Sequence, residues 1–326
     1  MRLRYVALFL LVVVAGLAGF FGWFQETLRR DGPLEKSAIV YIEPGSTTKK
    51  IAADLQDAGA IDSPLVFYYG SKIGPGALKG LRFGEYEIQA HASIAAIIEL
   101  LQSGKTYQRH VTIPEGLTSA EIVDIVNNAE VMTGKIETVP PEGSLLPQTY
   151  NYSRGDTRAS LIDHMTRDMK KTLAELWEKH APSDQIKTTE EAVALASIVE
   201  KETGLPTERP RVAGVFYNRL KLGMPLQSDP TVIYAVTQGK AKLGRPLTHA
   251  DLELPSAYNT YAHPGLPPGP IANPGRASLE AVMNPEKNDY IYFVANGTGG
   301  HSFARTLDEH NRNVAKWREA EKAAKP

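Results

Sequence analysis

The apolar positions of this chain change their period several times, and each change predicts a structural element. Residues 5–24 form an apolar run without a charged side chain. At 1.5 Å per residue, a helix of about twenty residues spans the roughly 30 Å hydrocarbon core of a bilayer. Arg2 and Arg4 precede the run and favour a cytoplasmic N-terminus, although Arg29 and Arg30 weaken this asymmetry. The pattern predicts a single transmembrane helix.

A cleaved signal peptide is the alternative for this segment. The small residues AGLAG at positions 15–19 would suit cleavage, but the apolar run continues through Phe20, Phe21 and Trp23. That is longer than the apolar part of a signal peptide. We therefore expect residues 1–30 to be a cytoplasmic stub and a retained anchor. With either alternative, the chain from residue 25 onward lies outside the cytoplasm.

A short alternating pattern followed by a helical one occurs twice. VYIEPGSTTKKIAADL (residues 40–55) aligns with VTIPEGLTSAEIVDIV (residues 111–126), glycine on glycine. Each copy predicts a strand, a turn and a helix. Ser46 and Thr118 are the expected helix N-caps, because a hydroxyl can accept from free amides in the first turn. Two copies are too few for a solenoid and indicate paired β–turn–helix units.

Two further helices and a strand are predicted between these copies. Helical spacing occurs in SPLVFYYGSKI and in SIAAIIELLQSG, the second capped by Ser93 and ended by Gly104. FGEYEIQA, residues 83–90, predicts a strand. The strand–helix–helix–strand order over residues 38–90 resembles a LysM-like module, a small fold that often holds N-acetylglucosamine polymers. A structural spacer built from the same elements is an equal alternative.

The whole pattern predicts an α+β protein in four segments. The anchor, residues 1–30, precedes a LysM-like domain at 31–105. Residues 106–158 hold the second β–turn–helix unit and a connection rich in proline and glycine. Residues 159–326 form a mixed α+β domain that begins with a long helix.

Composition excludes several classes of protein. The chain has 326 residues, 36 basic and 37 acidic side chains and a net charge of −1, so a broad basic face for nucleic acid is not expected. It has no cysteine, which excludes disulfides, thiolate zinc sites and a cysteine nucleophile. His301 has no partner at metal-ligand spacing, so neither a metal site nor a cofactor is expected.

The stretch LASIVEKETG carries two candidate acids at the end of a helix. Thr188 and Glu191 predict a capping box, and Gly204 ends the helix. Glu200 and Glu202 flank the apolar stripe on opposite sides, and periodicity alone does not choose between them.

Small residues favour Glu200 as the functional acid. It shares its face with Ala196 and Ser197, which leave room for a ligand. The alternative is a structural ion pair between Glu200 and an arginine. The candidate arginines are Arg209, Arg211 and Arg219.

The segments after this helix concentrate amides, hydroxyls and tyrosines. Aromatic faces cover the C–H surfaces of sugars, and amides exchange hydrogen bonds with hydroxyl and acetamido groups. Prolines between residues 264 and 274 stiffen one of the loops. The predicted sugar-binding residues are Gln227, Ser228, Asp229, Tyr258, Asn259, Thr260 and Asn273.

These motifs together resemble a known family. The blocks LASIVEKET, VFYNRL, LQSDPTVIY, AYNTY, GLPPGPIANPG and YFVANGTGGHSF closely resemble the signature blocks of the YceG-like family of endolytic murein transglycosylases. The resemblance is most specific over residues 194–304. It implies that residues 159–326 are catalytic and that Glu200, the first glutamate of IVEKET, is the catalytic acid. It also implies that the glycan groove is lined by Gln227, Ser228, Asp229, Tyr258 and Asn259.

The implied reaction cleaves the β-1,4 bond between N-acetylmuramic acid and N-acetylglucosamine without adding water, leaving 1,6-anhydro ends. Burial beside Ile198 and Val199 would keep the acid protonated. The family further implies a bacterial cytoplasmic-membrane protein with an extracytoplasmic catalytic part. Its function would be to terminate nascent glycan strands in company with peptidoglycan synthases.

Two alternatives remain from the sequence. Asp229 is a nearby carboxylate that would allow a lysozyme-like muramidase to act with Glu200. A membrane-tethered scaffold that binds peptidoglycan without cleaving it is the other.

Overall fold

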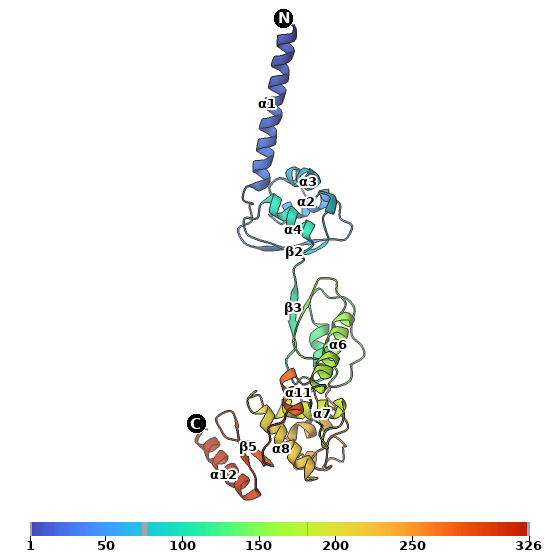
Figure 1. Ribbon diagram of the computed structural model, residues 1–326, viewed down its shortest axis with the longest axis vertical. Helices are drawn as coiled ribbons and strands as arrows, with labels where there is room; N and C mark the ends of the chain where they lie inside the picture. Colours follow the sequence, from blue (N-terminus) through green and yellow to red (C-terminus); the bar gives the residue numbers. More distant parts are fainter. Residues whose placement is uncertain (1, 74–76, 181, 325–326) are drawn as a thin grey trace. The chain divides into compact units, whose positions relative to one another are not determined.

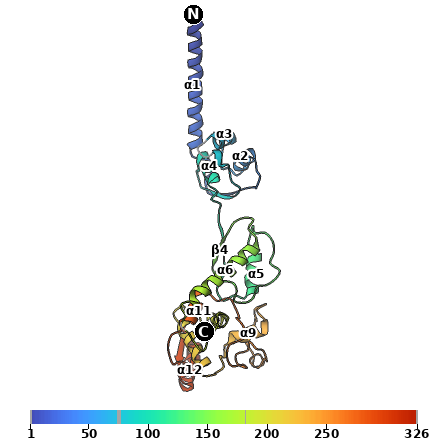
Figure 2. The ribbon, with the colours of Figure 1, turned by 45° about the vertical axis from the view of Figure 1, so that its right-hand side comes forward.

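The N-terminal apolar run is a continuous helix, α1 (Arg2–Arg29), in the computed structural model shown in Figures 1 and 2. The structure describes residues 2–73, 77–180 and 182–324. From Arg4 to Arg29 the helix is long and apolar enough to cross a membrane. Most of the helix is exposed, but its last turn is not. Thr27 and Leu28 are buried against the domain that follows.

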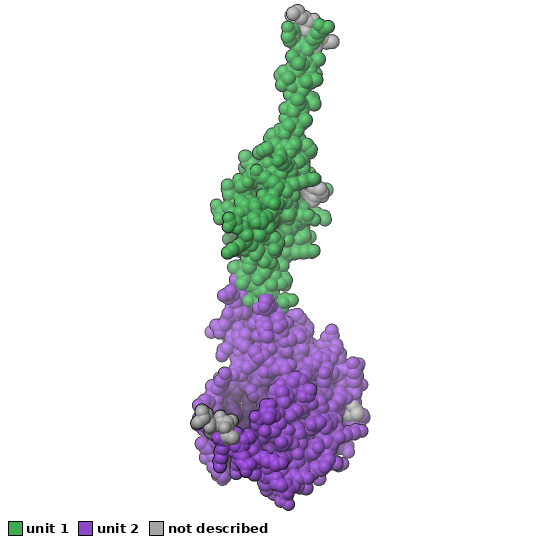
Figure 3. All heavy atoms as spheres, turned by 90° about the vertical axis from the view of Figure 1, so that its left-hand side faces the viewer, with its two compact units in different colours: residues 1–109, 151–155 green, residues 110–150, 156–326 purple. Residues whose placement is uncertain are grey.

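Contacts divide the chain into two units, coloured separately in Figure 3. Unit 1 comprises residues 1–109 and 151–155, and unit 2 comprises residues 110–150 and 156–326.

Unit 1 contains a two-stranded antiparallel sheet and four short helical segments beside α1. The strands β1 (Ala38–Ile42) and β2 (Gly84–Ile88) pair with Val40 opposite Tyr86. The helical elements are α2 (Thr48–Asp57), α3 (Pro64–Ile73), the 3₁₀ turn η1 (Ala77–Lys79) and α4 (Ile94–Ser103). The alternating apolar side of the sheet and the apolar faces of the helices share one core, which includes Ile42, Leu55, Phe67, Tyr86 and Leu101.

Local capping signals in this unit are confirmed except for one. Ser93 caps α4, and Gly104 follows its end at φ 70°. The expected N-cap Ser46 was wrong, since the Thr47 hydroxyl accepts from Lys50 N instead. The turn accounts for this shift, because Ser46 N–H donates back to the Glu43 carbonyl and the helix begins one residue later.

Unit 2 is mostly helical with small sheets. Strand β3 (Arg109–Thr112) pairs with β4 (Thr149–Tyr152). The first residue of β3 and the last two residues of β4 are assigned to unit 1, and the rest of both strands to unit 2. Strands β5 (Tyr292–Ala295) and β6 (His301–Ala304) form an antiparallel hairpin. The helices are α5 (Ser119–Asn127), α6 (Arg158–Trp177), α7 (Thr189–Glu202), α8 (Arg209–Lys221), α9 (Asp229–Thr237), α10 (His249–Leu252), α11 (Arg276–Met283) and α12 (Leu307–Ala324). The mixed α+β architecture is therefore confirmed.

Helix α7 lies at the centre of unit 2. The predicted capping box of Thr188 and Glu191 is present at its start. All eight residues from Ala192 to Val199 are buried, not only one stripe, because α8 and α11 both pack against this helix. Only the two ends of the helix reach the surface, and the two glutamates of the motif lie at its C-terminal end.

Candidate active site

Glu200 is buried and paired with an arginine. Its side chain is 5% exposed, and Arg209 Nη2 donates to Glu200 Oε1 at 2.8 Å. The backbone N–H of Gly275, at the start of α11, donates to Oε2 at 2.9 Å. Both carboxylate oxygens are thus engaged by the protein. Of the three arginines considered as structural partners, the fold selects Arg209.

Opposing effects act on the pKa of Glu200. Burial raises it, and the nearby charge of Glu115 adds to the rise. The Gly275 N–H, the nearby Ser278 hydroxyl and Arg209 lower it, and the net direction is upward. Ser278 Oγ itself is buried without a partner at hydrogen-bonding geometry among the described residues. The Glu200 carboxylate is therefore shielded from water, and the Arg209 guanidinium binds it.

Glu115 completes this cluster, and nothing in the sequence pattern singled it out. Arg209 Nη2 also donates to Glu115 Oε2 at 3.0 Å, so one nitrogen serves two carboxylates. A Cβ added at Gly275 would lie 1.8 Å from Glu115 Oε1, which shows how closely the carboxylate approaches this backbone. A cavity of about 440 Å³ is lined by Glu115 together with Gln148 and Lys171, and Glu200 is not among its lining residues.

Glu202 occupies a different environment on the other side of the same helix end. It is partly buried, and the Ser228 hydroxyl donates to its Oε1 at 2.5 Å. Burial is the largest effect on its pKa, which rises to about 6, and the charge of Asp229 adds to the rise. Ser228, His301 and Arg219 act in the opposite direction. Glu202 is thus a carboxyl poised to exchange a proton near neutral pH.

Exposed polar residues adjoin Glu202. Asp229 is exposed at the first position of α9 and accepts from the Tyr261 hydroxyl at 2.6 Å. Gln227 is also exposed and adopts φ 50°, a conformation that non-glycine residues rarely take. Such local strain is often kept at functional positions. Of the predicted sugar-binding residues, these two are the most accessible to a ligand.

Four other predicted sugar-binding residues face the interior. Ser228, Asn259, Thr260 and Asn273 are each at most 1% exposed. Asn259 donates to the carbonyls of Leu252 and Leu254, and Thr260 Oγ1 accepts from Ser228 N. The fold uses these side chains to brace the loops of unit 2, because a buried polar group must find a partner inside the protein.

Asn273 has the most extensive set of internal partners. Its Oδ1 accepts from Leu145 N at 3.0 Å, and its Nδ2 donates to the Leu117 carbonyl and the Ser119 hydroxyl. Tyr258 is intermediate, with a half-buried ring whose centroid lies 4.8 Å from that of Tyr234. The amide-rich composition of these loops therefore reflects internal bracing as well as surface chemistry.

Comparison with known proteins agrees with the motifs. Residues 40–316 match the model of the YceG-like family. The chain belongs to the YceG-like family. An endolytic murein transglycosylase of Bacillus subtilis is 34% identical over 324 residues, which covers 87% of each chain. One from Streptococcus pneumoniae is 32% identical over 94% of this chain and 63% of its own length.

A solved YceG-like structure also resembles this chain. The crystal structure of a putative yceG-like protein from Listeria monocytogenes matches with a TM-score of 0.53 and 32% identity. The match covers 85% of this chain and 99% of the other.

One more pair in this YceG-like site was not expected. His301 Nδ1 lies 2.7 Å from Glu208 Oε2, and the His301 backbone N–H donates to Glu208 Oε1. This contact links the start of α8 to β6 and holds His301 where its charge lowers the pKa of Glu202. The sequence pattern could not reveal this pair, because Glu208 lies 93 positions away from His301.

Proposed function

We propose that this protein is a lytic transglycosylase of peptidoglycan. It would cleave the β-1,4 bond between N-acetylmuramic acid and N-acetylglucosamine and leave a 1,6-anhydro end. Membership of the YceG-like family and the names of its relatives support the class of reaction. The single observation that carries the chemistry is the Glu202 carboxyl at the end of α7, which accepts from the Ser228 hydroxyl and whose pKa is raised by burial to about 6.

One carboxyl group suffices for this reaction. Protonated Glu202 would donate to the glycosidic oxygen as the bond to the muramoyl C1 breaks. The resulting carboxylate would then accept the proton of the C6 hydroxyl as that oxygen closes onto C1. An ordinary glycosidase needs a second carboxylate to handle water or to act as the nucleophile. Here the substrate carries its own nucleophile, which has a high effective concentration.

Glu202 suits this cycle better than Glu200, the residue that the family resemblance suggested. Both oxygens of Glu200 are taken by Arg209 and by Gly275 N–H, and its side chain is 5% exposed. Glu202 forms an ion pair with no arginine among the described residues, and its bond from Ser228 can stabilise the carboxylate formed after proton donation. We propose Glu202 as the proton donor and Glu200 as the buried charge that orients Arg209 and the start of α11.

Two variants separate these assignments. Glu202→Gln should lower cleavage of purified sacculi by at least about a hundredfold, because the general acid is lost. Glu200→Gln should lower stability by about 1–3 kcal/mol, because an amide NH2 donor replaces one of the two oxygens that accept from Arg209 and Gly275. Turnover per folded molecule should fall less than about tenfold. A folded but inactive Glu200→Gln protein beside an active Glu202→Gln protein would return the catalytic role to Glu200.

Asp229 supports a second candidate, a lysozyme-like muramidase. Its carboxylate raises the pKa of Glu202 and is exposed beside it, so it could take part in hydrolysis. Mass spectrometry of the products distinguishes the reactions, because anhydro ends are lighter than reducing ends by one water. We expect anhydro products, with Asp229 stabilising positive charge at C1.

The remaining parts of the proposal concern location. We propose that α1 anchors the protein in the bacterial cytoplasmic membrane and that unit 1 is a LysM-like module. The βααβ order of β1, α2, α3 and β2 supports the module. Cleavage near the membrane would terminate nascent glycan strands as the synthases extend them. If sacculi bind the protein without being cleaved, a non-catalytic scaffold would replace the enzyme.

A further inference from the structure

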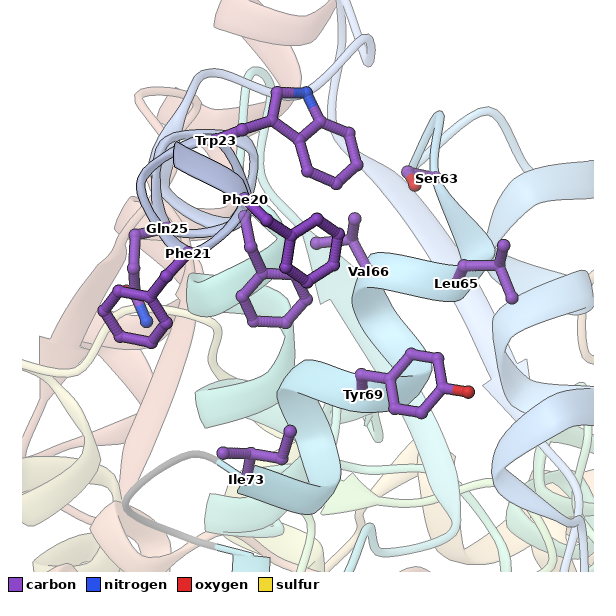
Figure 4. Close-up of a pocket in the computed structure, with 10 residues that line it drawn as sticks. Phe20, Phe21, Trp23, Gln25, Ser63, Leu65, Val66, Tyr69 and Ile73 are labelled. Carbon is purple, nitrogen blue, oxygen red and sulfur yellow. The ribbon is translucent and has the colours of Figure 1, made fainter. Parts of the chain in front are cut away.

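An apolar pocket of about 510 Å³ lies within unit 1, between the end of α1 and helix α3. Figure 4 shows the side chains that line it, with Phe20 and Trp23 from α1 and Leu65, Val66 and Tyr69 from α3. It is formed almost entirely by aromatic and aliphatic groups. A soluble domain rarely leaves such a surface open to water, so an apolar occupant is expected.

Helix α3 contributes an exposed apolar stripe to this surface. Leu65, Tyr69 and Ile73 recur every four residues on one face and are 71%, 52% and 72% exposed. The opposite face, with Val66, Phe67 and Gly70, is buried in the core of unit 1. The helix is therefore apolar on both sides, although its outer side meets no other part of the described chain that buries it.

Close packing fixes the stripe beside α1. A Cβ at Gly70 would lie 2.7 Å from Leu28 Cδ2, so the absence of a side chain lets α1 approach α3 directly. Phe20 and Phe21 of α1 are 62% and 60% exposed and belong to the same pocket. The apolar surface of the proposed membrane helix thus continues without a break onto α3.

We propose that this continuous surface is a lipid-docking face, in which α3 lies in the headgroup and acyl boundary of the leaflet where α1 leaves the bilayer. The inference rests on the proposed anchoring role of α1. Continuity with the spanning helix favours lipid over a protein partner, because the exposed apolar run of α1 that leads into this surface would itself be surrounded by lipid. Trp23 and Tyr69 are residue types enriched at membrane interfaces. Lys72, exposed at the end of α3, can meet phosphate headgroups.

Figures 1 and 2 show α3 on the side of unit 1 where α1 enters, and Figure 1 shows β2 on the far side of that unit. A bilayer around α1 therefore meets α3 first and leaves β2 in water. The docking face would hold unit 1 against the membrane surface, instead of leaving it to swing on a single helix.

The chain lacks cysteine, so single nitroxide labels can test this face cleanly. We suggest the variants Leu65→Cys and Ile73→Cys in the full chain, reconstituted at one copy per nanodisc of phosphatidylcholine and phosphatidylglycerol. One copy per disc prevents a second chain from covering the face. Phe9→Cys, within the exposed apolar run of α1, reports the bilayer, and Glu87→Cys, exposed on β2, reports water. All four sites are exposed, so folding should be unaffected.

Nitroxides at positions 65, 73 and 9 should collide more often with oxygen than with a water-soluble nickel chelate. The nitroxide at position 87 should collide more often with the nickel chelate. Water-like behaviour at 65 and 73, with a bilayer signal at 9, would overturn the lipid-docking face and leave the anchor standing. A water-like signal at 9 as well would overturn both. Neither result would alter the assignment of Glu202, because sacculus cleavage is measured separately.

Discussion

Arg209 Nη2 lies 2.8 Å from Glu200 Oε1 and 3.0 Å from Glu115 Oε2, so one guanidinium nitrogen joins two carboxylates from distant parts of unit 2. Arg209 and Glu200 are both nearly inaccessible, with side chains 8% and 5% exposed. Removal of one partner from a buried ion pair is costly, because it leaves a charge without compensation. The cluster therefore has a structural role that can be measured apart from catalysis.

Arg209→Met should lower the free energy of unfolding by about 3 kcal/mol at pH 8. The loss should be smaller at pH 5, because Glu200, whose pKa is already raised by burial, can then take up a proton. Urea unfolding at the two pH values measures this difference. Arg276→Met is the matched control, since its pairs with Glu175 and Glu280 are exposed and should contribute less than about 1 kcal/mol. An equal loss in both variants would contradict the buried-pair argument.

The stability of the protein should depend on pH through Glu202. Its pKa rises from 4.5 to about 6 on folding, so the folded state binds this proton more tightly than the unfolded state. The resulting stability is present below pH 4.5 and is lost as the pH rises to about 6. The 1.5-unit difference corresponds to about 2 kcal/mol. The difference in unfolding free energy between wild type and Glu202→Gln should change across this window, and a flat difference would refute the assigned pKa.

Neighbours of Glu202 should move its pKa in opposite directions. Ser228→Ala removes a hydrogen bond that lowers the pKa, so the midpoint of the activity profile should shift to higher pH. Asp229→Asn removes a negative charge that raises the pKa, so the midpoint should shift to lower pH. Rates of sacculus cleavage as a function of pH report both shifts. If Glu200 were the acid, both substitutions should move the midpoint much less, because the main effects on the Glu200 pKa come from its burial and from Gly275, Ser278, Arg209 and Glu115.

Asn273→Ala tests whether this residue braces the fold or contacts glycan. Its removal leaves the Leu145 N–H without its acceptor, which should cost about 2 kcal/mol. Thermal or urea unfolding measures that cost. Asn311→Ala, exposed on α12, should change stability by less than about 0.5 kcal/mol. An Asn273→Ala protein of unchanged stability that had lost glycan binding would instead support the groove role that the sequence predicted.

Local patterns determined the elements of this protein. The apolar run predicted α1, and short-range signals placed Ser93, Thr118 and Thr188 as helix caps, because a capping hydroxyl bonds an amide only three residues away. The missed cap at Ser46 was off by one residue, since the turn before α2 depends on a backbone bond that composition does not reveal.

The tertiary structure decided the roles of the polar residues. Whether Glu200 or Glu202 is free to exchange a proton depends on Arg209, Gly275 and Ser228, which the fold brings to the end of α7 from different parts of the chain. The loop amides that looked suited to sugars turn inward for the same reason, since the loop packs on α7, where Ile271 N–H donates to the Ser197 hydroxyl. Periodicity reports which face of an element is apolar, but the partners of a buried polar group are set by contacts distant in sequence, and those contacts decide its charge and its chemistry.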